Sequence, residues 1–398
     1  PLIRKDTQHM GISIGLVGLG SFGSTFAELF KAHPLVDRIA LCDREPERVA
    51  RFANKPSFQD KFSADDAYTS LDEICRSHVD ALAIITQPWL HAEQAVQAMQ
   101  AGKHVYSAVP VVSLPDGDEI LDWCDKLVET CGRSGLHYML GETTCYRPQT
   151  MYCRRQAAAN AFGHFVYAEG EYLHDVDSVG ANLREVRRRR MASQAGQEWA
   201  AQVKRSGGRD LGGGPMHYPT HSTSGPIHIM QAHALKVSAW GFRPPQPDPY
   251  FGNEFSNETA LFQMSNGATM RICEFRQVGH KDTEIFRIFG TEGTFRENSW
   301  VDRANATPLT VDEMRDPLPP EVEEAFRSIN PNSDFYGGHG GSHAYLVHEF
   351  VDAIAHDRAP AIHAWEAVRY MAAGVMAHKS ALRDGELLDV PDWGDGPG

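Results

Sequence analysis

Several features of common protein classes are missing from this 398-residue sequence. Its seven Cys residues include no C-x-x-C pair, which argues against a disulfide framework or a zinc ribbon and favours reduced, buried thiols. No apolar run reaches the roughly 18 residues of a membrane span, and the polar start from Pro1 to His9 lacks the pattern of a secretory signal. We therefore expect a cytoplasmic protein that binds no membrane.

Basic residues are in deficit as well. The 38 Lys and Arg residues face 52 Asp and Glu residues, which leaves a formal net charge of -14. This surplus of negative charge repels phosphates at long range and argues against nucleic acid as a partner. A small-molecule substrate fits the composition better. The length exceeds the ~250–300 residues at which a single core stops growing, so we expect two domains.

Short apolar runs alternate with amphipathic stretches in the first third of the chain. Runs rich in β-branched residues that are separated by helices are typical of parallel strands with crossover connections. The expected strands are 12–17, 39–42, 81–85, 103–107 and 136–140, and the clearest helices are 24–30 and 116–130. The pattern predicts an α/β fold, with a Rossmann dinucleotide-binding domain over residues 11–145.

The pattern changes after Pro148. Alternating runs at 165–173, 259–277, 284–289 and 293–297 predict strands with one exposed face, and Asn266-Gly267 is a strong hairpin turn within the second of them. A Pro-rich loop is expected at 308–331, and closing helices are expected at 342–356 and 364–382. We predict a C-terminal α+β domain with an open antiparallel sheet over 146–382, which includes the closing helices 342–382, and a tail over 383–398.

A glycine-rich loop carries the strongest functional signal. Gly18-Leu-Gly20-Ser-Phe-Gly23 follows a predicted strand and opens a predicted helix, where backbone N–H groups can approach a pyrophosphate. Asp43 ends the next strand, where its carboxylate can accept the adenosine ribose hydroxyls and repel a 2′-phosphate. NAD is therefore the expected cofactor, while the neighbouring Arg44 leaves NADP open. The expected cofactor residues here are Gly18, Gly20, Ser21, Phe22, Gly23, Asp43 and Arg44.

Further landmarks resemble the Gfo/Idh/MocA family of sugar and inositol oxidoreductases over nearly the whole length. They are the glycine loop, Thr86-Gln-Pro-Trp-Leu-His91, Phe289-Gly-Thr-Glu-Gly293, His343-x-x-x-x-His348-Glu-Phe and Ala377-His-Lys-Ser380. The resemblance implies a Rossmann domain followed by an open-faced sheet that mediates homo-oligomers. Thr86, Gln87 and His91 leave a strand end and border the nicotinamide side, although His91 also fits a plain helix start.

Two departures from the family pattern point to one of its branches. The stretch Ala108-Val109-Pro110 stands where dehydrogenases of the family carry Glu-Lys-Pro with its catalytic Lys, and His217-Tyr-Pro-Thr-His221 replaces their Asp-x-x-x-His element. Both departures are similar to the NAD-dependent glycosidases of the family, such as α-N-acetylgalactosaminidases. Val109 and Pro110 then belong to the cofactor side, and an ordinary dehydrogenase reaction is disfavoured.

The same resemblance implies the catalytic roles. Such enzymes oxidise a ring hydroxyl with bound NAD, eliminate the anomeric group, add water and return the hydride. His221 would be the base at the hydroxyl, and Tyr172, assisted by His174, would act at carbon 2; Glu142 and Tyr218 complete the set. Tyr172 and His174 are two residues apart on a predicted strand and therefore share one face of it. Two polar aromatic residues without a catalytic role could also lie together on a strand face. His217 and His221 lack a third ligand, so no metal is predicted.

Five of the seven residues from Arg184 to Arg190 are Arg. A solvated helix face is the ordinary reading of such a run, while an anion pocket for a sulfonated or acidic sugar is the alternative. Arg184, Arg187 and His217 are the candidate substrate contacts. We expect a glycosidase for an anionic glycoside such as a sulfoquinovoside, or for an α-N-acetylgalactosaminide. The alternatives are an NAD-dependent sugar or inositol dehydrogenase and a non-catalytic NAD-binding regulator.

Overall fold

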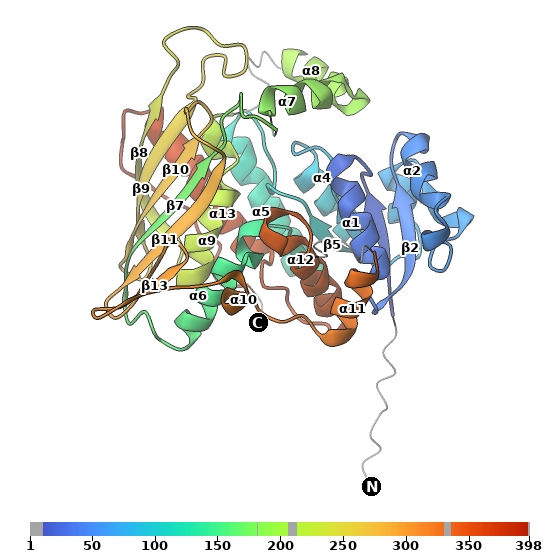
Figure 1. Cartoon of the computed structure of the whole chain (residues 1–398). Helices are drawn as coiled ribbons and strands as arrows, with labels where there is room; N and C mark the ends of the chain where they lie inside the picture. Colours follow the sequence, from blue (N-terminus) through green and yellow to red (C-terminus); the bar gives the residue numbers. More distant parts are fainter. Residues whose placement is uncertain (1–10, 181, 206–212, 330–335, 397–398) are drawn as a thin grey trace.

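The computed structural model describes residues 11–180, 182–205, 213–329 and 336–396, which form two β-sheets with helices between and around them (Figure 1). The first sheet has six strands in the order β3-β2-β1-β4-β5-β6, and every pair in it is parallel. This is the doubly wound arrangement that the sequence predicted. The reversal of strand order between β1 and β4 opens a crevice at the carboxyl ends of the strands.

The elements of the first sheet region follow the expected alternation. In chain order they are β1 (Ile12–Val17), α1 (Ser21–Ala32), β2 (Val36–Cys42), α2 (Pro46–Ala53), β3 (Ala67–Tyr68), α3 (Leu71–Cys75), β4 (Ala81–Ile84), α4 (His91–Gln100), β5 (His104–Ser107), α5 (Gly117–Ser134) and β6 (Tyr138–Leu140), with short 3₁₀ turns at Pro56–Phe58 and Ala64–Asp66. The central strands β1 and β4 are almost wholly buried because helices cover both faces of the sheet.

The second sheet has nine strands in the order β14-β13-β12-β11-β7-β10-β9-β8-β15. Its elements, with the helices around them, are the 3₁₀ turn Thr143–Tyr146, α6 (Pro148–Ala158), β7 (Phe165–Leu173), α7 (Leu183–Ala192), α8 (Gln194–Arg205), the 3₁₀ turn Pro215–His217, α9 (Thr220–Met230), β8 (Ala234–Phe242), β9 (Asn257–Met264), β10 (Thr269–Phe275), β11 (Thr283–Gly290), β12 (Thr294–Arg296), β13 (Ser299–Val301), β14 (Ala306–Pro308), α10 (Val311–Met314), α11 (Pro320–Ile329), α12 (Gly338–Ala355), α13 (Ala364–Ala381) and β15 (Leu388–Asp389).

The pairing of this sheet confirms most of the expected strands. β9 and β10 form the antiparallel hairpin, and Gly267 takes a φ of 86° in its turn. The sheet is mostly antiparallel, but β7 and β10 run parallel and are far apart in the sequence. The strand propensities of the residues could not predict this pairing, because it is decided by how the long chain segment between β7 and β10 folds.

Helices α9 and α13 pack against the inner face of the nine-stranded sheet, and α13 also packs against α5 of the first sheet region. The two sheets are therefore joined through a shared helical layer, which lies between them in Figure 1. Helices α7 and α8 leave this layer and lie over the gap between the two sheets, at the top of the same view.

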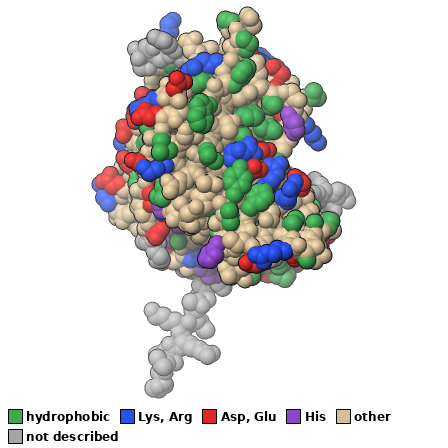
Figure 2. Space-filling view, turned by 90° about the vertical axis from the view of Figure 1, so that its left-hand side faces the viewer, with side chains coloured by type: hydrophobic (Ala, Val, Ile, Leu, Met, Phe, Trp, Pro, Cys, Tyr) green, Lys and Arg blue, Asp and Glu red, His purple; other side chains and the backbone are tan. Residues whose placement is uncertain are grey.

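The outer face of the nine-stranded sheet has no helix over it in the described part of the chain, and Figure 2 shows this face. Exposed hydrophobic side chains from β8, β9 and β11, including Trp240, Leu261 and Ile285, stand among charged ones. Arg271 and Arg287 form ion pairs with acidic side chains of β7 on this face.

The expected loop at 308–331 is wrong for most of its length. Helix α10 begins with a capping box between Thr310 and Glu313, and α11 begins with Pro320 in its first turn and buries Val322 and Phe326. Pro320 thus marks a helix start rather than an irregular loop. Residues 330–331 lie outside the described residues.

Two smaller expectations concern cysteine and membranes. All seven Cys residues are buried and free, as expected. Among the described residues, no helix combines the length and the apolar composition that a membrane crossing requires.

One close approach positions the site described below. Gly170 lies on β7 where the backbone of α9 passes over the strand, and a Cβ at Gly170 would come within 1.9 Å of the Ser222 carbonyl oxygen. Overpacking of this kind costs about 1–3 kcal/mol, sometimes more. We expect Gly170→Ala to lower the free energy of unfolding by at least this amount in chemical denaturation, and to reduce activity because β7 and α9 are pushed apart.

Gly279→Ala is the matched control for this variant, because an added Cβ there meets no atom within 4 Å. Equal stability of the two variants would contradict the close packing of α9 on β7.

Candidate functional site

The glycine loop is shaped to accept an anion. Helix α1 begins after Gly20 with no side-chain cap and no acidic residue in its first turn, so its first N–H groups have no partner from the helix itself. Gly18 takes a φ of 92°, and a Cβ at Gly23 would lie 2.0 Å from the Gly18 carbonyl oxygen. Only glycine fits at both positions. Unpaired N–H groups at a helix N-terminus suit the pyrophosphate of a dinucleotide.

Asp43 lies just beyond the end of β2, beside this loop. Its Oδ2 accepts a hydrogen bond from the Leu19 backbone N–H (2.7 Å), and its Oδ1 accepts one from the Glu45 N–H (3.0 Å). The carboxylate therefore fixes the glycine loop. Its assignment to the ribose hydroxyls stays a prediction.

His91 and Val109 line the neighbouring cavity from the side of the first sheet region, and the peptide bond between Val109 and Pro110 is cis. His91 is buried, and its Nδ1 lies 2.9 Å from the Pro110 carbonyl oxygen. Burial lowers the pKa of His91 to about 4, so the ring is neutral near pH 7. The Val109 carbonyl accepts a hydrogen bond from the Tyr218 hydroxyl (3.2 Å). Tyr218 thereby reaches across from the second sheet region.

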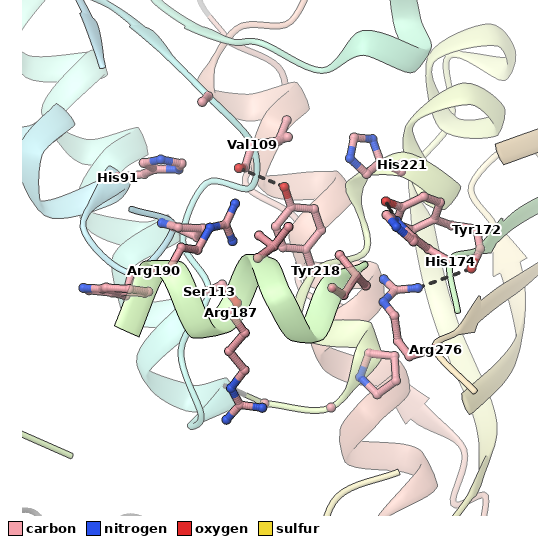
Figure 3. A pocket seen from close by; sticks show the side chains of 18 of the residues that line it. His91, Val109, Ser113, Tyr172, His174, Arg187, Arg190, Tyr218, His221 and Arg276 are labelled. Carbon is pink, nitrogen blue, oxygen red and sulfur yellow. Dashed lines mark hydrogen bonds between the residues drawn. The ribbon is translucent and has the colours of Figure 1, made fainter. Parts of the chain in front are cut away.

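A cavity of about 410 Å³ lies between the two sheet regions. Figure 3 shows that His91 and Val109 lie on one side of it, Tyr172, His174 and Arg276 lie on the other, and helix α7 with Arg187 and Arg190 crosses in front. Of the predicted residues, those that line it are Phe22, Thr86, His91, Val109, Tyr172, His174, Arg187, Tyr218 and His221.

His221 is held by carboxylates behind it. Its Nδ1 lies 3.0 Å from Glu142 Oε1 and 3.7 Å from Glu284 Oε1. Burial disfavours the charged ring, but the two carboxylates outweigh burial and raise the pKa of His221. Because Nδ1–H donates to Glu142, the other ring nitrogen, Nε2, is the basic atom of the neutral ring. Glu142 itself does not line the cavity, so it acts on the site through His221.

Glu142, His221 and Glu284 bring three possible metal-ligand atoms within 4.8 Å of one another. Each of the three groups already has partners of the opposite charge or a donor. Arg147 lies 2.5 Å from Glu284 Oε2, Thr144 Oγ1 donates to the other oxygen of Glu284, and the Thr144 N–H donates to Glu142 (2.9 Å). The positive charges of Arg147 and protonated His221 occupy the place of a cation, so the cluster fits a proton-transfer site better than a metal centre.

Tyr172 and His174 lie on the β7 side of the cavity. The Tyr172 hydroxyl is 2.6 Å from His174 Nδ1, and His174 Nε2 is 3.6 Å from Asp282 Oδ2. The Asp282 carboxylate favours a proton on Nε2, which leaves Nδ1 to accept from the tyrosine. Burial raises the pKa of Tyr172, while the Arg276 guanidinium, 4.6 Å from the ring centroid, opposes that rise. The phenol therefore has a built-in proton acceptor.

The arginine run forms helix α7, and its members have different environments. Arg184 is bound by Asp177 and Asp248 and does not line the cavity. Arg188 and Arg189 pair with Glu185 on the exposed side of the helix. The anion-pocket hypothesis therefore has to rest on two other residues, Arg187 and Arg190, which line the cavity.

His217 is also placed differently from the expectation. Its side chain is buried and does not line the cavity. Its Nδ1 lies 2.9 Å from the Leu114 carbonyl oxygen, and its ring centroid lies 4.5 Å from that of His378. A side chain enclosed in this way cannot touch a sugar in the cavity. Gln87 and Pro110 also do not line the cavity, although their neighbours Thr86 and Val109 do.

Among the lining residues that sequence reasoning did not single out are Arg276 and His339, while Arg190 was part of the arginine run but was not named as a substrate contact. Arg276 is buried, and its Nη2 lies 2.6 Å from Glu274 Oε2. His339 has a φ of 54°, and its Nδ1 lies 3.0 Å from His343 Nε2. The glycines on both sides of His339 were a usable signal, because a run of four glycines around one imidazole indicates an unusual backbone that presents a side chain. Arg276 carries no such signal.

The fold and the cavity define a dinucleotide-binding protein with a Rossmann sheet and a second, mostly antiparallel sheet on the other side of the cavity. Residues 12–141 match the family model of the NAD-binding Rossmann domain of the Gfo/Idh/MocA oxidoreductases. Residues 182–386 match the model of the C-terminal alpha/beta domain of the same family. The chain therefore belongs to the Gfo/Idh/MocA oxidoreductase family, and its cofactor is NAD.

Curated relatives are similar over almost the full chain but at low identity. A glycosyl hydrolase family 109 protein of Streptomyces filamentosus is 24% identical, covering 99% of this chain and 78% of its own length. A protein of the same name from Solibacter usitatus is 24% identical, covering 96% of this chain and 88% of its own.

Solved structures of the same fold include dehydrogenases. Levoglucosan dehydrogenase in complex with NADH and levoglucosan has a TM-score of 0.69 at 18% identity, covering 96% of this chain and 99% of the other. Myo-inositol 2-dehydrogenase from Lactobacillus plantarum has a TM-score of 0.66 at 15% identity, covering 96% and 100%.

The pairing of His221 with Glu142 predicts the pH dependence of any reaction that uses His221 as a base. The raised pKa keeps the ring protonated and inactive at low pH, so kcat/KM should rise with pH through a value above the ordinary 6.5. Removing the carboxylate in Glu142→Gln lowers that pKa, so the acidic limb should move to lower pH by about one unit or more. A pH profile of kcat/KM measures this shift.

The control for this prediction is Glu366→Gln, because Glu366 makes a similar buried contact with His228 on the same helix (3.3 Å) but lies outside the cavity. A limb that stays in place in Glu142→Gln, or that moves equally in both variants, would show that His221 is not the titrating base.

Proposed function

We propose that the protein is an NAD-dependent glycoside hydrolase that works by transient oxidation of a sugar ring. The observation that carries this proposal is the presence of two separate proton acceptors on one cavity, His221 with Glu142 and Tyr172 with His174. A simple alcohol oxidation needs only one base. Oxidation followed by elimination needs a second one for a carbon acid.

The first base acts on a ring hydroxyl. NAD, when bound, would supply the hydride acceptor for the oxidation of the hydroxyl-bearing carbon and the hydride donor for the later reduction. His221 Nε2 takes the hydroxyl proton, and Glu142 with Glu284 stabilises the resulting imidazolium. His221 would thus replace the proton acceptor that a Lys supplies in dehydrogenases of the family. Val109 stands at the position of that Lys and offers only its backbone carbonyl, which accepts a hydrogen bond from Tyr218.

The second acceptor acts on the carbon next to the new ketone. Tyr172 is poised for this step because its proton can pass to His174, whose far nitrogen faces Asp282. Loss of the carbon proton expels the anomeric substituent, and water then adds in its place. Tyr218 and His339 line the same cavity and are the further groups that can donate a proton to the departing oxygen.

An NAD-dependent sugar or inositol dehydrogenase is the second candidate function. It is favoured by the solved structures of the same fold, which include such enzymes. A non-catalytic NAD-binding regulator would not need the two proton-transfer pairs of the cavity, so this function agrees with the site less well than either enzyme does.

For the substrate we infer a glycoside with an anionic group, such as a sulfonate or carboxylate. Arg187 and Arg190 line the cavity, and Glu254 is the one Asp or Glu side chain among its described lining residues. Arg190 has no ion-pair partner among the described residues, whereas its neighbours Arg188 and Arg189 do. A neutral α-N-acetylgalactosaminide is the alternative substrate.

We also expect a cytoplasmic homo-oligomer that associates through the outer face of the nine-stranded sheet. The exposed Trp240 and Leu261 and the paired charges on that face (Figure 2) support a contact between two copies. Neither nucleic acid nor a membrane is expected as a partner.

Net-neutral redox chemistry is the first test. With NAD in catalytic amount, we expect many turnovers of a nitrophenyl glycoside, no accumulation of NADH, and deuterium at carbon 2 of the product in heavy water. Tyr172→Phe should lose both cleavage and exchange by about 10²–10⁴-fold, the usual contribution of a proton-transfer group, with NAD affinity unchanged.

Accumulation of one NADH per oxidised sugar would instead establish the dehydrogenase. Cleavage without incorporation of deuterium would exclude elimination through a carbon acid, whatever the role of Tyr172.

Arg190 provides the test of substrate class. If it binds an anionic group, Arg190→Ala should raise KM for a nitrophenyl sulfoquinovoside about tenfold or more, as expected for a lost hydrogen bond to a charged group, and change KM for the neutral N-acetylgalactosaminide little. Arg188→Ala, on the exposed side of the same helix, is the control. Better turnover of the neutral substrate by the unmodified protein would assign the site to the amino sugar.

A further inference from the structure

Helix α8 follows β7 of the nine-stranded sheet in the chain but packs beside the crevice of the six-stranded parallel sheet. The Trp199 ring stacks on that of Trp89, with centroids 5.7 Å apart and planes 13° from parallel. Trp89 belongs to the loop after β4, and Trp199 is buried. One turn of α8 is thereby anchored at the carboxyl edge of the parallel sheet (Figure 1), where the dinucleotide binds.

The residue before Trp199 makes the second contact with this edge. Glu198 binds Arg44 through two hydrogen bonds, Nη1 to Oε2 (2.8 Å) and Nη2 to Oε1 (2.9 Å). Gln194, one turn earlier, donates to Oε1 of the same carboxylate (3.0 Å). The hydrogen bond to Arg44 lowers the pKa of Glu198, so the carboxylate is charged throughout the neutral range.

Arg44 is the residue that leaves NADP open as a cofactor. It follows Asp43 at the end of β2, and an arginine at this place can hold the 2′-phosphate of NADP with its guanidinium fork. In the structure that fork is fully engaged by Glu198. A 2′-phosphate would have to displace one carboxylate from Arg44 while it also lies near the carboxylate of Asp43.

We propose that Glu198 determines the choice of NAD over NADP. It occupies the guanidinium of Arg44 and adds a second negative charge beside Asp43 at the 2′ position of the adenosine ribose. The Trp89–Trp199 stack keeps Glu198 in place, so the second domain supplies part of the cofactor specificity of the first. This inference concerns the cofactor alone and holds for a glycosidase and for a dehydrogenase.

The test compares binding of NAD and NADP to the full-length protein by calorimetry. Glu198→Ala frees Arg44 and removes one negative charge, so the ratio of the NADP Kd to the NAD Kd should fall at least about tenfold, the scale of one hydrogen bond to a charged group. Glu185→Ala is the matched control, because it breaks a similar pair with Arg188 on α7, outside the cofactor crevice.

Two further variants separate this role from a general loosening of the protein. In Arg44→Ala the ratio should change little, because the guanidinium is already engaged. In Arg44→Ala with Glu198→Ala most of the gain in NADP binding should disappear, which is the coupling expected when one residue acts through the other. A loss of folded protein lowers the binding capacity for both cofactors and leaves the ratio of the Kd values unchanged.

An unchanged ratio in Glu198→Ala would overturn the proposal. A gain in NADP binding that persists in full without Arg44 would overturn the role given to the Arg44–Glu198 pair, because the negative charge of Glu198 would then account for the whole effect.

Discussion

The buried contact between Glu142 and His221 is the interaction on which the arrangement of the site depends. Glu142 follows the last strand of the parallel sheet, and His221 lies in the first turn of α9, which covers the second sheet. Each group is charged and buried, and such a pair is strongly destabilised when one partner is removed. The contact therefore holds the parallel sheet and the proton-transfer residues of the second sheet region in a fixed position relative to each other.

The cavity is lined by arginines although the chain as a whole carries an excess of negative charge. The molecule carries a net charge of -14, yet Arg187 and Arg190 of α7 and Arg276, just after β10, line the cavity between the sheets. A positive cavity in a negative molecule attracts anions locally while the remaining surface repels them. Within α7, Arg184, Arg188 and Arg189 do not line the cavity and are paired with acidic residues nearby. The two arginines of this helix that face the cavity are Arg187 and Arg190.

The features that sequence predicted well are those set by neighbouring residues. The glycine loop needs positive φ and close backbone approach at fixed positions, and the Asn266-Gly267 turn is defined by two residues. What the sequence could not show depends on distant packing. Which arginines of the run line the cavity is decided by the way α7 crosses the gap, and Arg276 lines it because β10, which it follows, pairs with β7. His217 resembled a site residue because it precedes Tyr218, although its side chain turns away toward Leu114.

The seven buried thiols have a practical consequence for the chemistry of the whole molecule. Burial raises the pKa of each of them, to about 12 for Cys42 and about 11 for Cys75, so the thiolate that reacts with oxidants and alkylating reagents is scarce near neutral pH. We therefore expect the native protein to react only slowly with maleimides. A cysteine introduced at an exposed position such as Val179 would be the one fast-reacting thiol, which allows a single fluorophore to be attached without removing any natural cysteine.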